Sequence, residues 1–406
     1  MHRIEAALSA VVNDGKLAGA ATLICRGDSV RVACVGMRDL ESRLPVEQDT
    51  IFRIASMSKP VTCTLALMLF EEGRFRLEDP ITSFAPEFGH MRVLRSPEGP
   101  LEDSCAADRP ITFDDLLTHR AGISNSALHR GPIGKAYADA LGHDIDNELT
   151  PDEWIRRLAQ LPLIDQPGNG FHYGNSTDLL GFLMSRIEGA PLADLFEQRV
   201  FAPLGMKDTG FLVRTENRDR RAALCGFDDE GHLTALTTVP GSHTLPERPN
   251  GMTWASGGQG LWSTLDDYST FARMFVDGGT VEGVRLLKPQ TLSMMASNQL
   301  TASQRASAKM FGRPLFAAGH GYGFGVAVVT EPEKADPLRC GGGVGAVGWP
   351  GAYGGWWQAD PNDGSVMIFL SHNMTELHQM AAGIGISVWG AISEFQALAT
   401  AALREM

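Results

Sequence analysis

The β-strand patterns of this chain lie at its two ends, and helical patterns fill the region between them. Near the N-terminus, residues 18–36 contain two β-rich runs separated by a short turn. Strand patterns return at residues 320–329 and 354–372, where the pair Asp363-Gly364 predicts a hairpin turn. This order predicts an α/β fold of the α+β type, in which an antiparallel sheet is assembled from both chain ends and flanked by helices.

The middle of the chain predicts short helices joined by long loops that are rich in proline, glycine and aspartate. The helical patterns with polar residues near their starts are residues 114–123, 151–161 and 176–189. A helix closed by glycine is expected at residues 265–279, and a C-terminal helix is expected at residues 376–406.

These patterns divide the chain into two expected domains. Residues 1–75 and 250–406 would form an α/β sheet domain, and residues 76–249 would form an inserted, mainly helical domain. A chain of 406 residues is long enough to bury a sizeable core in such an arrangement. We expect the active site to lie between the two domains.

Charge and composition exclude several classes of protein. The formal net charge is −13, and an acidic surface repels nucleic-acid phosphates, so no nucleic-acid partner is expected. The longest apolar run, residues 61–70, is interrupted by threonines and is too short to span a bilayer, and Glu5 interrupts any signal-peptide pattern. The six cysteines have no metal-ligand spacing. We therefore expect a cytoplasmic protein with no membrane insertion, no metal and no cofactor.

The first turn of an apolar helix pattern carries a serine and a lysine, Ser56 and Lys59. A serine hydroxyl is a poor nucleophile unless a base lies within hydrogen-bond reach. Residues i and i+3 of a helix share a face, so Lys59 can lie beside Ser56, and the positive helix N-terminus stabilises an anionic nucleophile. Pro60 is compatible with this position because first-turn N–H groups have no partner within the helix. By itself, S-x-x-K is also compatible with a surface lysine.

Further motifs follow this pair in a fixed order. Tyr173-Gly174-Asn175 precedes an amphipathic helix, and the glycine-rich stretch GGGVGAVGWPGAYGGWW lies far downstream. With FRIASMSKPVT, DDLLTHRAGI, APLGMKDTGF and GGQGLWSTLDDYSTFARMFVDGG, most of the chain resembles the serine β-lactamase and penicillin-binding-protein superfamily. It is most similar to the class C β-lactamase-related esterases, the family VIII carboxylesterases.

This resemblance implies a role for each matching residue. Ser56 would be the acylated nucleophile, with Lys59 as its neighbour. Tyr173 would be the general base, assisted by Lys59, and Asn175 would orient Lys59 and the substrate. Which of Lys59 and Tyr173 holds the proton is left open by the sequence.

The third motif of the β-lactamases, K-T-G, is replaced here by Trp349-Pro350-Gly351. The lysine and threonine that would bind a β-lactam carboxylate are absent, which favours neutral esters over penicillins. By the same resemblance, Trp349 and Gly351 would contact the substrate, and the backbone N–H groups of Ser56 and Ala352 would form an oxyanion hole. The alternative for Trp349 is a core residue of a strand.

Other motifs favour different chemistry only weakly. Residues 343–348 match G-x-G-x-x-G, but no helix pattern follows, so these glycines are expected to bring the backbone close to the substrate. No complete G-x-S-x-G occurs. His119, His172 and two further histidines are interpreted as structural or surface residues, although His172 could line the site beside Tyr173.

The resulting functional hypothesis is a serine carboxylesterase that cleaves short-chain esters through an acyl-enzyme. Its expected partner is a small-molecule ester, and the oligomeric state is undetermined by the sequence. One alternative is a β-lactamase, D-Ala-D-Ala peptidase or amidase on the same scaffold. The other is a non-catalytic relative that only binds a ligand.

Overall fold

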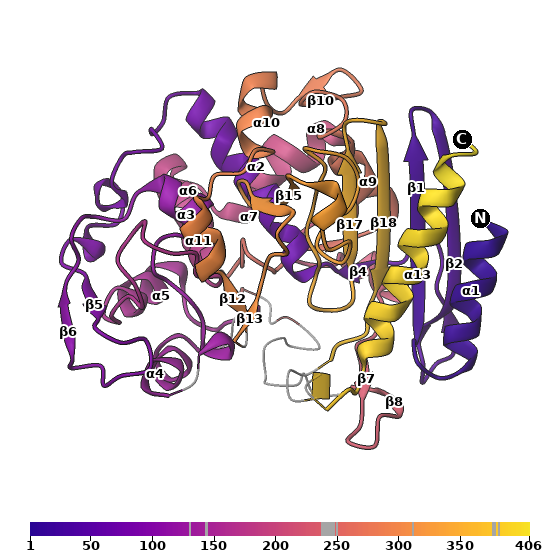
Figure 1. The fold of residues 1–406 in the computed structure, drawn as a ribbon, viewed down its shortest axis with the longest axis horizontal. Coiled ribbons are helices and arrows are strands. Elements are labelled where there is room, and N and C mark those ends of the chain that lie inside the picture. The colour runs from indigo at the N-terminus through magenta and orange to yellow at the C-terminus, as the bar shows by residue number, and fades with distance from the viewer. Residues whose placement is uncertain are drawn as a thin grey trace.

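The computed structural model describes most of the chain. The described residues are 1–129, 131–142, 145–236, 248, 251–310, 312–375, 379–380 and 382–406. Figure 1 shows helices gathered on one side and a sheet on the other, with both chain termini beside the sheet.

Among these residues, the main sheet has eight strands in the order β14-β15-β16-β17-β18-β1-β2-β3, with antiparallel pairing throughout. The strands are β1 (Gly19–Arg26), β2 (Ser29–Asp39), β3 (Leu44–Pro45), β14 (His320–Tyr322), β15 (Ala327–Val329), β16 (Val347–Gly348), β17 (Trp356–Asp360) and β18 (Ser365–Ser371). The N-terminal β1 pairs with the C-terminal β18, which confirms the sheet predicted from both chain ends.

Both faces of the central strands are covered. Along β1, Ala20 and Ile24 face the apolar cluster formed with α1 (His2–Asn13) and α13 (Ile386–Leu403). Ala21, Leu23 and Cys25 face the larger cluster on the opposite side. This alternation is the period-2 arrangement of a strand, and burial on both faces explains why β1 reads as a nearly continuous apolar run.

The C-terminal helix begins later than the sequence predicted. Gly385 has φ +71 and precedes α13, which starts at Ile386 rather than at residue 376. Residues 376–378 and 381 of the predicted helix lie outside the described part of the chain. Within that part, α13 is the one helix whose length and composition would allow it to cross a membrane, and it packs against α1, β1 and β18.

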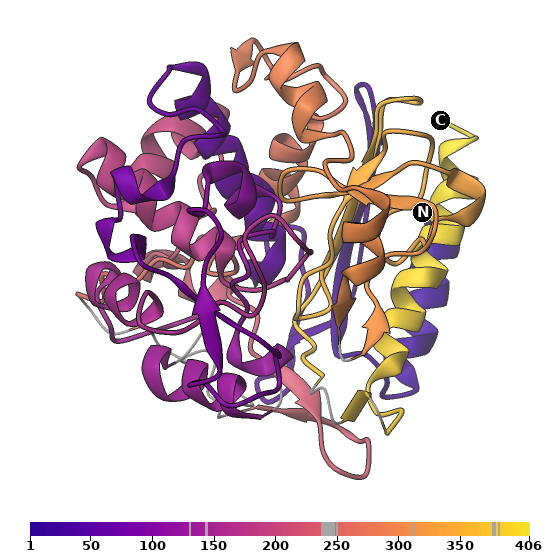
Figure 2. The ribbon, with the colours of Figure 1, turned by 60° about the vertical axis from the view of Figure 1, so that its left-hand side comes forward.

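The remaining helices cover the other side of the sheet or form the helical region seen in Figure 2. They are α2 (Ser58–Glu71), α3 (Phe113–Leu117), α4 (Pro132–Leu141), α5 (Pro151–Leu158), α6 (Ser176–Glu188), α7 (Leu192–Phe196), α8 (Ala202–Leu204), α9 (Leu265–Arg273), α10 (Pro289–Met295) and α11 (Ala302–Ser307). Short two-stranded ladders accompany them: β4 (Phe52–Arg53) with β9 (Trp262–Ser263), β5 (Arg92–Leu94) with β6 (Ser104–Ala106), β7 (Cys225–Phe227) with β8 (Leu233–Ala235), β10 (Thr280–Val281) with β11 (Val284–Arg285), and β12 (Lys309–Met310) with β13 (Arg313–Pro314).

Helix α2 is the central helix of the molecule. Most of its residues are buried, including all those of its first turn, and the helix packs against α6. A helix that is apolar on all sides is stable only when it is surrounded by protein. The segment that carries the S-x-x-K pattern is therefore held in the core rather than at the surface.

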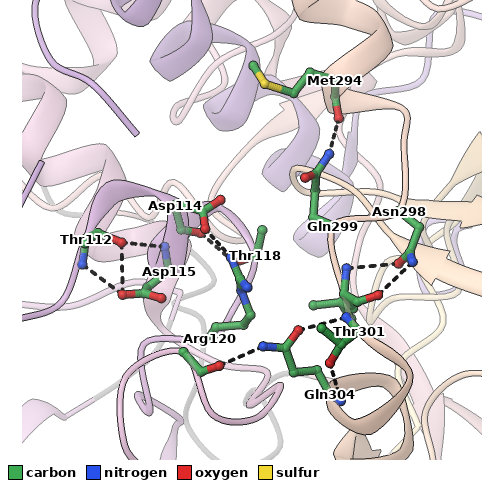
Figure 3. A network of polar contacts seen from close by, with 12 residues as sticks. Thr112, Asp114, Asp115, Thr118, Arg120, Met294, Asn298, Gln299, Thr301 and Gln304 are labelled. Carbon is green, nitrogen blue, oxygen red and sulfur yellow. Dashed lines mark hydrogen bonds and ion pairs between the residues drawn. The ribbon is translucent and has the colours of Figure 1, made fainter. Parts of the chain in front are cut away.

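Helix α11 joins the sheet side of the chain to the loop that precedes α6. Figure 3 shows Gln304 of α11 near Arg120, with the Thr112 and Asp115 capping contacts of α3 further away. The Gln304 side chain donates to Gly168 O at 2.7 Å, and Phe171 N donates to Ser307 Oγ at 3.2 Å. These contacts fix the loop just before the Tyr173 motif.

Candidate active site

Ser56 lies in a short 3₁₀ helix, η1 (Ala55–Met57), directly before α2. The turn is sharp because Ala55 adopts φ +48, a left-handed conformation that is uncommon for alanine. Hydrogen bonds hold the turn on both sides: Ser58 Oγ donates to Ala55 O at 2.6 Å, and Tyr268 Oη donates to Met57 O at 2.9 Å. Ser56 is thus fixed at the start of the central helix, with 7% of its surface exposed.

Lys59 reaches back to the serine, as the helical spacing predicts. Its Nζ donates to Ser56 Oγ at 3.3 Å and to Gly258 O at 2.9 Å, and the side chain is 2% exposed. The same Nζ lies 4.6 Å from the centroid of the Tyr173 ring. No carboxylate forms an ion pair with Lys59 among the described residues, so its amine is held by neutral oxygens and an aromatic face.

Tyr173 reaches the site from the loop before α6. Its backbone carbonyl accepts a hydrogen bond from Ser124 Oγ at 3.0 Å. Gly174 follows, and a Cβ there would lie 2.5 Å from the Ser124 carbonyl carbon, so only glycine allows this close approach. The glycine of the Tyr-Gly-Asn motif therefore has a packing role that places the tyrosine.

The third motif contributes an indole instead of a lysine. Trp349 is 1% exposed, and its Nε1 donates to Tyr173 Oη at 3.1 Å. Trp349 thus packs in an aromatic core cluster, and it also contacts the predicted general base.

Gly351 passes directly against the Ser56 turn, and Ala352 follows it. Gly351 N donates to Gly355 O at 2.7 Å, and a Cβ on Gly351 would lie 2.5 Å from Ile54 O. Ala352 is exposed. In the described part of the chain, neither its N–H nor that of Ser56 donates to a backbone carbonyl.

Asn175 is buried and begins α6. Its backbone N donates to Ser124 O at 3.4 Å. Within the described ranges, no hydrogen bond joins its side chain to Lys59, and Gly258 O is the partner that orients the lysine instead.

Asp178 is a buried site residue that the sequence did not single out. Its Oδ1 accepts hydrogen bonds from Ser256 Oγ at 2.5 Å and from Gly258 N at 3.1 Å, and its surface is 2% exposed. Burial raises the pKa of the Asp178 carboxyl, and the charge of Lys59 opposes this rise. In the sequence, an aspartate in the first turn of α6 has the appearance of an ordinary helix-start residue.

His119, rather than His172, packs against Tyr173. The two ring centroids are 4.9 Å apart, and His119 Nε2 lies 3.4 Å from Thr177 Oγ1. Burial, with the charge of Lys59 adding to it, holds the pKa of His119 well below its usual range, so this imidazole is neutral. His172 instead contacts Asp165, with Nε2 at 2.9 Å from Oδ2.

The G-x-G-x-x-G segment packs against Asp360 of β17. No helix follows it; it leads into β16 and then Trp349. Gly343 N donates to Asp360 Oδ2 at 2.7 Å, and a Cβ on Gly342 would lie 2.5 Å from the same oxygen. These glycines bring the backbone close to the neighbouring strand of the sheet.

Comparison with known proteins places these residues in a family context. The family model described as Beta-lactamase matches residues 4–384. Protein Rv1367c of Mycobacterium tuberculosis is 40% identical over 379 residues, which cover 93% of this chain and 91% of that protein. Esterase EstB of Burkholderia gladioli is 29% identical, with 92% and 91% covered. The solved structure of EstCE1, a hydrolase with promiscuous acyltransferase activity, superposes with a TM-score of 0.75 at 25% identity, covering 96% of this chain and 98% of that one.

Proposed function

This chain belongs to the beta-lactamase family, and we propose that it is a serine carboxylesterase that cleaves short-chain esters through an acyl-enzyme on Ser56. The observation that carries the proposal is the position of Lys59 Nζ, 3.3 Å from Ser56 Oγ and 4.6 Å from the Tyr173 ring centroid. Acyl transfer by a serine requires a base beside the nucleophile, and this contiguous group supplies an amine and a phenol for that task.

The proposed acylation step uses this group as follows. Ser56 Oγ attacks the carbonyl carbon of the ester while its proton passes to the Lys59–Tyr173 pair. The backbone N–H groups of Ser56 and Ala352 stabilise the negative oxygen of the tetrahedral intermediate. The bond to the alcohol oxygen then breaks, and the pair returns the proton to the departing alkoxide. Water attacks the acyl-enzyme by the same proton path and releases the carboxylic acid.

The third motif supports an ester rather than a β-lactam as substrate. At the position where β-lactamases carry a lysine, Trp349 offers an indole N–H that is already directed at Tyr173 Oη. Pro350 lacks an N–H and a hydroxyl, so this motif has no group for a carboxylate next to the reacting ring. EstB is named an esterase, which agrees with this choice.

The proposal is tested by comparing kcat/KM for p-nitrophenyl acetate and butyrate with kcat/KM for nitrocefin, benzylpenicillin and a D-Ala-D-Ala peptide. We expect the esters to react faster by roughly three orders of magnitude or more, because the third motif offers no partner for the carboxylate of the β-lactams and the peptide. Comparable values for esters and penicillin would favour the β-lactamase or peptidase alternative. Turnover of none of them, with no labelling of Ser56 by a phosphonate, would favour a non-catalytic binding protein.

We further propose that Asp178 is a positioning residue for Lys59. It holds the backbone of Gly258, whose carbonyl accepts the Lys59 N–H. Small displacements of a reacting group cost up to about 10²-fold in rate, so Asp178→Ala is expected to lower kcat roughly 10- to 100-fold with little change in KM. Asp178→Asn keeps an oxygen acceptor and should lose less.

The matched control for Asp178 is Asp194→Asn, an exposed aspartate of α7. Steady-state kinetics on p-nitrophenyl butyrate, together with the thermal midpoint of each variant, separates positioning from folding. A fall in the thermal midpoint of Asp178→Ala with unchanged kcat would show that Asp178 acts on stability alone.

A further inference from the structure

Arg339 lies against the residue that replaces the lysine of the third motif. Its guanidinium carbon is 5.6 Å from the centroid of the Trp349 ring. Its Nε donates to Leu315 O at 3.2 Å, and the side chain is partly buried. A guanidinium stacked on an aromatic face is held in a defined orientation. Among the described residues, the two Nη groups of Arg339 donate no hydrogen bond to the protein.

The charge of Arg339 is not balanced by an ion pair. Among the described residues, no carboxylate oxygen forms a salt bridge with it, and the Asp336 carboxylate accepts the backbone N–H of Leu338 instead. Burial lowers the pKa of Arg339, and the charges of Asp336 and Tyr173 oppose that shift. A charge removed from water is costly unless a partner of opposite charge supplies hydrogen bonds.

The position of Arg339 relative to Tyr173 indicates which part of a substrate it could contact. Under the proposed function, the Lys59–Tyr173 pair returns a proton to the departing alkoxide, so the alcohol portion of the ester lies on the side of this pair. The Tyr173 and Trp349 ring centroids are 5.5 Å apart, and Arg339 contacts the same indole. Within the described residues, no direct hydrogen bond or ring contact joins Arg339 to Tyr173. The Trp349 ring therefore separates the guanidinium from the position of the ester oxygen.

We propose that Arg339 binds a carboxylate on the alcohol portion of the substrate, so that the preferred substrates are esters of hydroxy acids. This inference rests on the proposed function and narrows it. The planar fork of a guanidinium pairs two N–H groups with the two oxygens of a carboxylate, which is the anion geometry that arginine matches best. A carboxylate directly beside the reacting bond, as in penicillin, would be too close to the ester oxygen to use this anchor.

Two pairs of chromogenic or ultraviolet-detectable esters test the inference. The alcohol-side pair is 4-acetoxybenzoate and its neutral match 4-acetoxybenzamide. The acyl-side pair is the mono-4-nitrophenyl ester of adipic acid and 4-nitrophenyl hexanoate. Each is assayed with the wild type, Arg339→Met, Arg339→Lys and the control Arg285→Met, which alters an exposed arginine of β11.

We expect Arg339→Met to lower kcat/KM for 4-acetoxybenzoate roughly ten- to hundredfold, because hydrogen bonds to charged groups are worth that much. The value for 4-acetoxybenzamide should change by less than about threefold, which also shows that the variant is folded. For 4-acetoxybenzoate, kcat/KM of Arg339→Lys should lie between the values of the wild type and Arg339→Met. An ammonium keeps the charge of the guanidinium but not its two-pronged hydrogen-bond geometry. Arg285→Met should match the wild type on both esters.

The outcomes separate this inference from the proposed function. If the wild type hydrolyses neither aryl acetate, the proposed function itself fails. If it hydrolyses both and Arg339→Met affects them equally or not at all, the carboxylate anchor is wrong and the esterase stands. A selective loss on the adipate ester alone would overturn the assignment to the alcohol portion.

Discussion

Replacing Ser56 with alanine is expected to abolish ester hydrolysis, with kcat falling on the order of 10³-fold or more, as removal of a catalytic nucleophile does elsewhere. Among the described residues, Lys59 Nζ lies within hydrogen-bond distance of two oxygens, Ser56 Oγ and Gly258 O. Alanine leaves the turn intact, because Ser58 and Tyr268 rather than the Ser56 hydroxyl hold it.

The same variant is checked by covalent labelling. Intact-mass spectrometry after treatment with a fluorophosphonate should show one adduct on the wild type, on the peptide that contains Ser56, and none on Ser56→Ala. Ser393→Ala, an exposed serine of α13, is the matched control and should be labelled like the wild type. An adduct on a different serine would contradict the assignment of the nucleophile.

The second large effect concerns Lys59 and Tyr173, the pair proposed to move the proton. Tyr173→Phe and Lys59→Ala are each expected to lower kcat on the order of 10²-fold or more, as loss of a general base does. Lys59 Nζ contacts both Ser56 Oγ and the Tyr173 ring, and under the proposed function Lys59 and Tyr173 share one proton path. The double variant should therefore be only slightly slower than the worse single variant, far from the product of the two losses.

Tyr322 offers a matched control for the tyrosine. It packs at 5.4 Å from the Trp349 ring, in the same aromatic cluster, and its buried hydroxyl has no hydrogen-bond partner in the described part of the chain. Tyr322→Phe should therefore keep kcat on p-nitrophenyl butyrate. A Tyr173→Phe enzyme with kcat near that of the wild type would show that the base lies elsewhere.

Local spacing was sufficient to predict several features of the molecule. Ser56 and Lys59 are one helical turn apart, and the structure brings their side chains together. The hairpin at Asp363-Gly364 joins β17 and β18, as its sequence predicts. Strand patterns at both chain ends were sufficient to predict the antiparallel sheet, because alternation and turn residues are properties of neighbouring positions.

Boundaries of elements were predicted less well. The helix expected at residues 114–123 ends at Leu117, and His119 follows with φ +54. The C-terminal helix starts only after Gly385. In both places a residue with positive φ marks the boundary, His119 after α3 and Gly385 before α13.

The sequence by itself determined the spacing of Ser56 and Lys59 and the order of the segments that build the sheet. Only the tertiary structure decided what surrounds them: Gly258 O on Lys59, Asp178 behind Gly258, and Arg339 on Trp349. The physical reason is the separation along the chain of the residues that interact. Helical and strand periodicity report which neighbours share a face, whereas the lysine and its Gly258 partner are 199 positions apart and meet only when the whole core has packed.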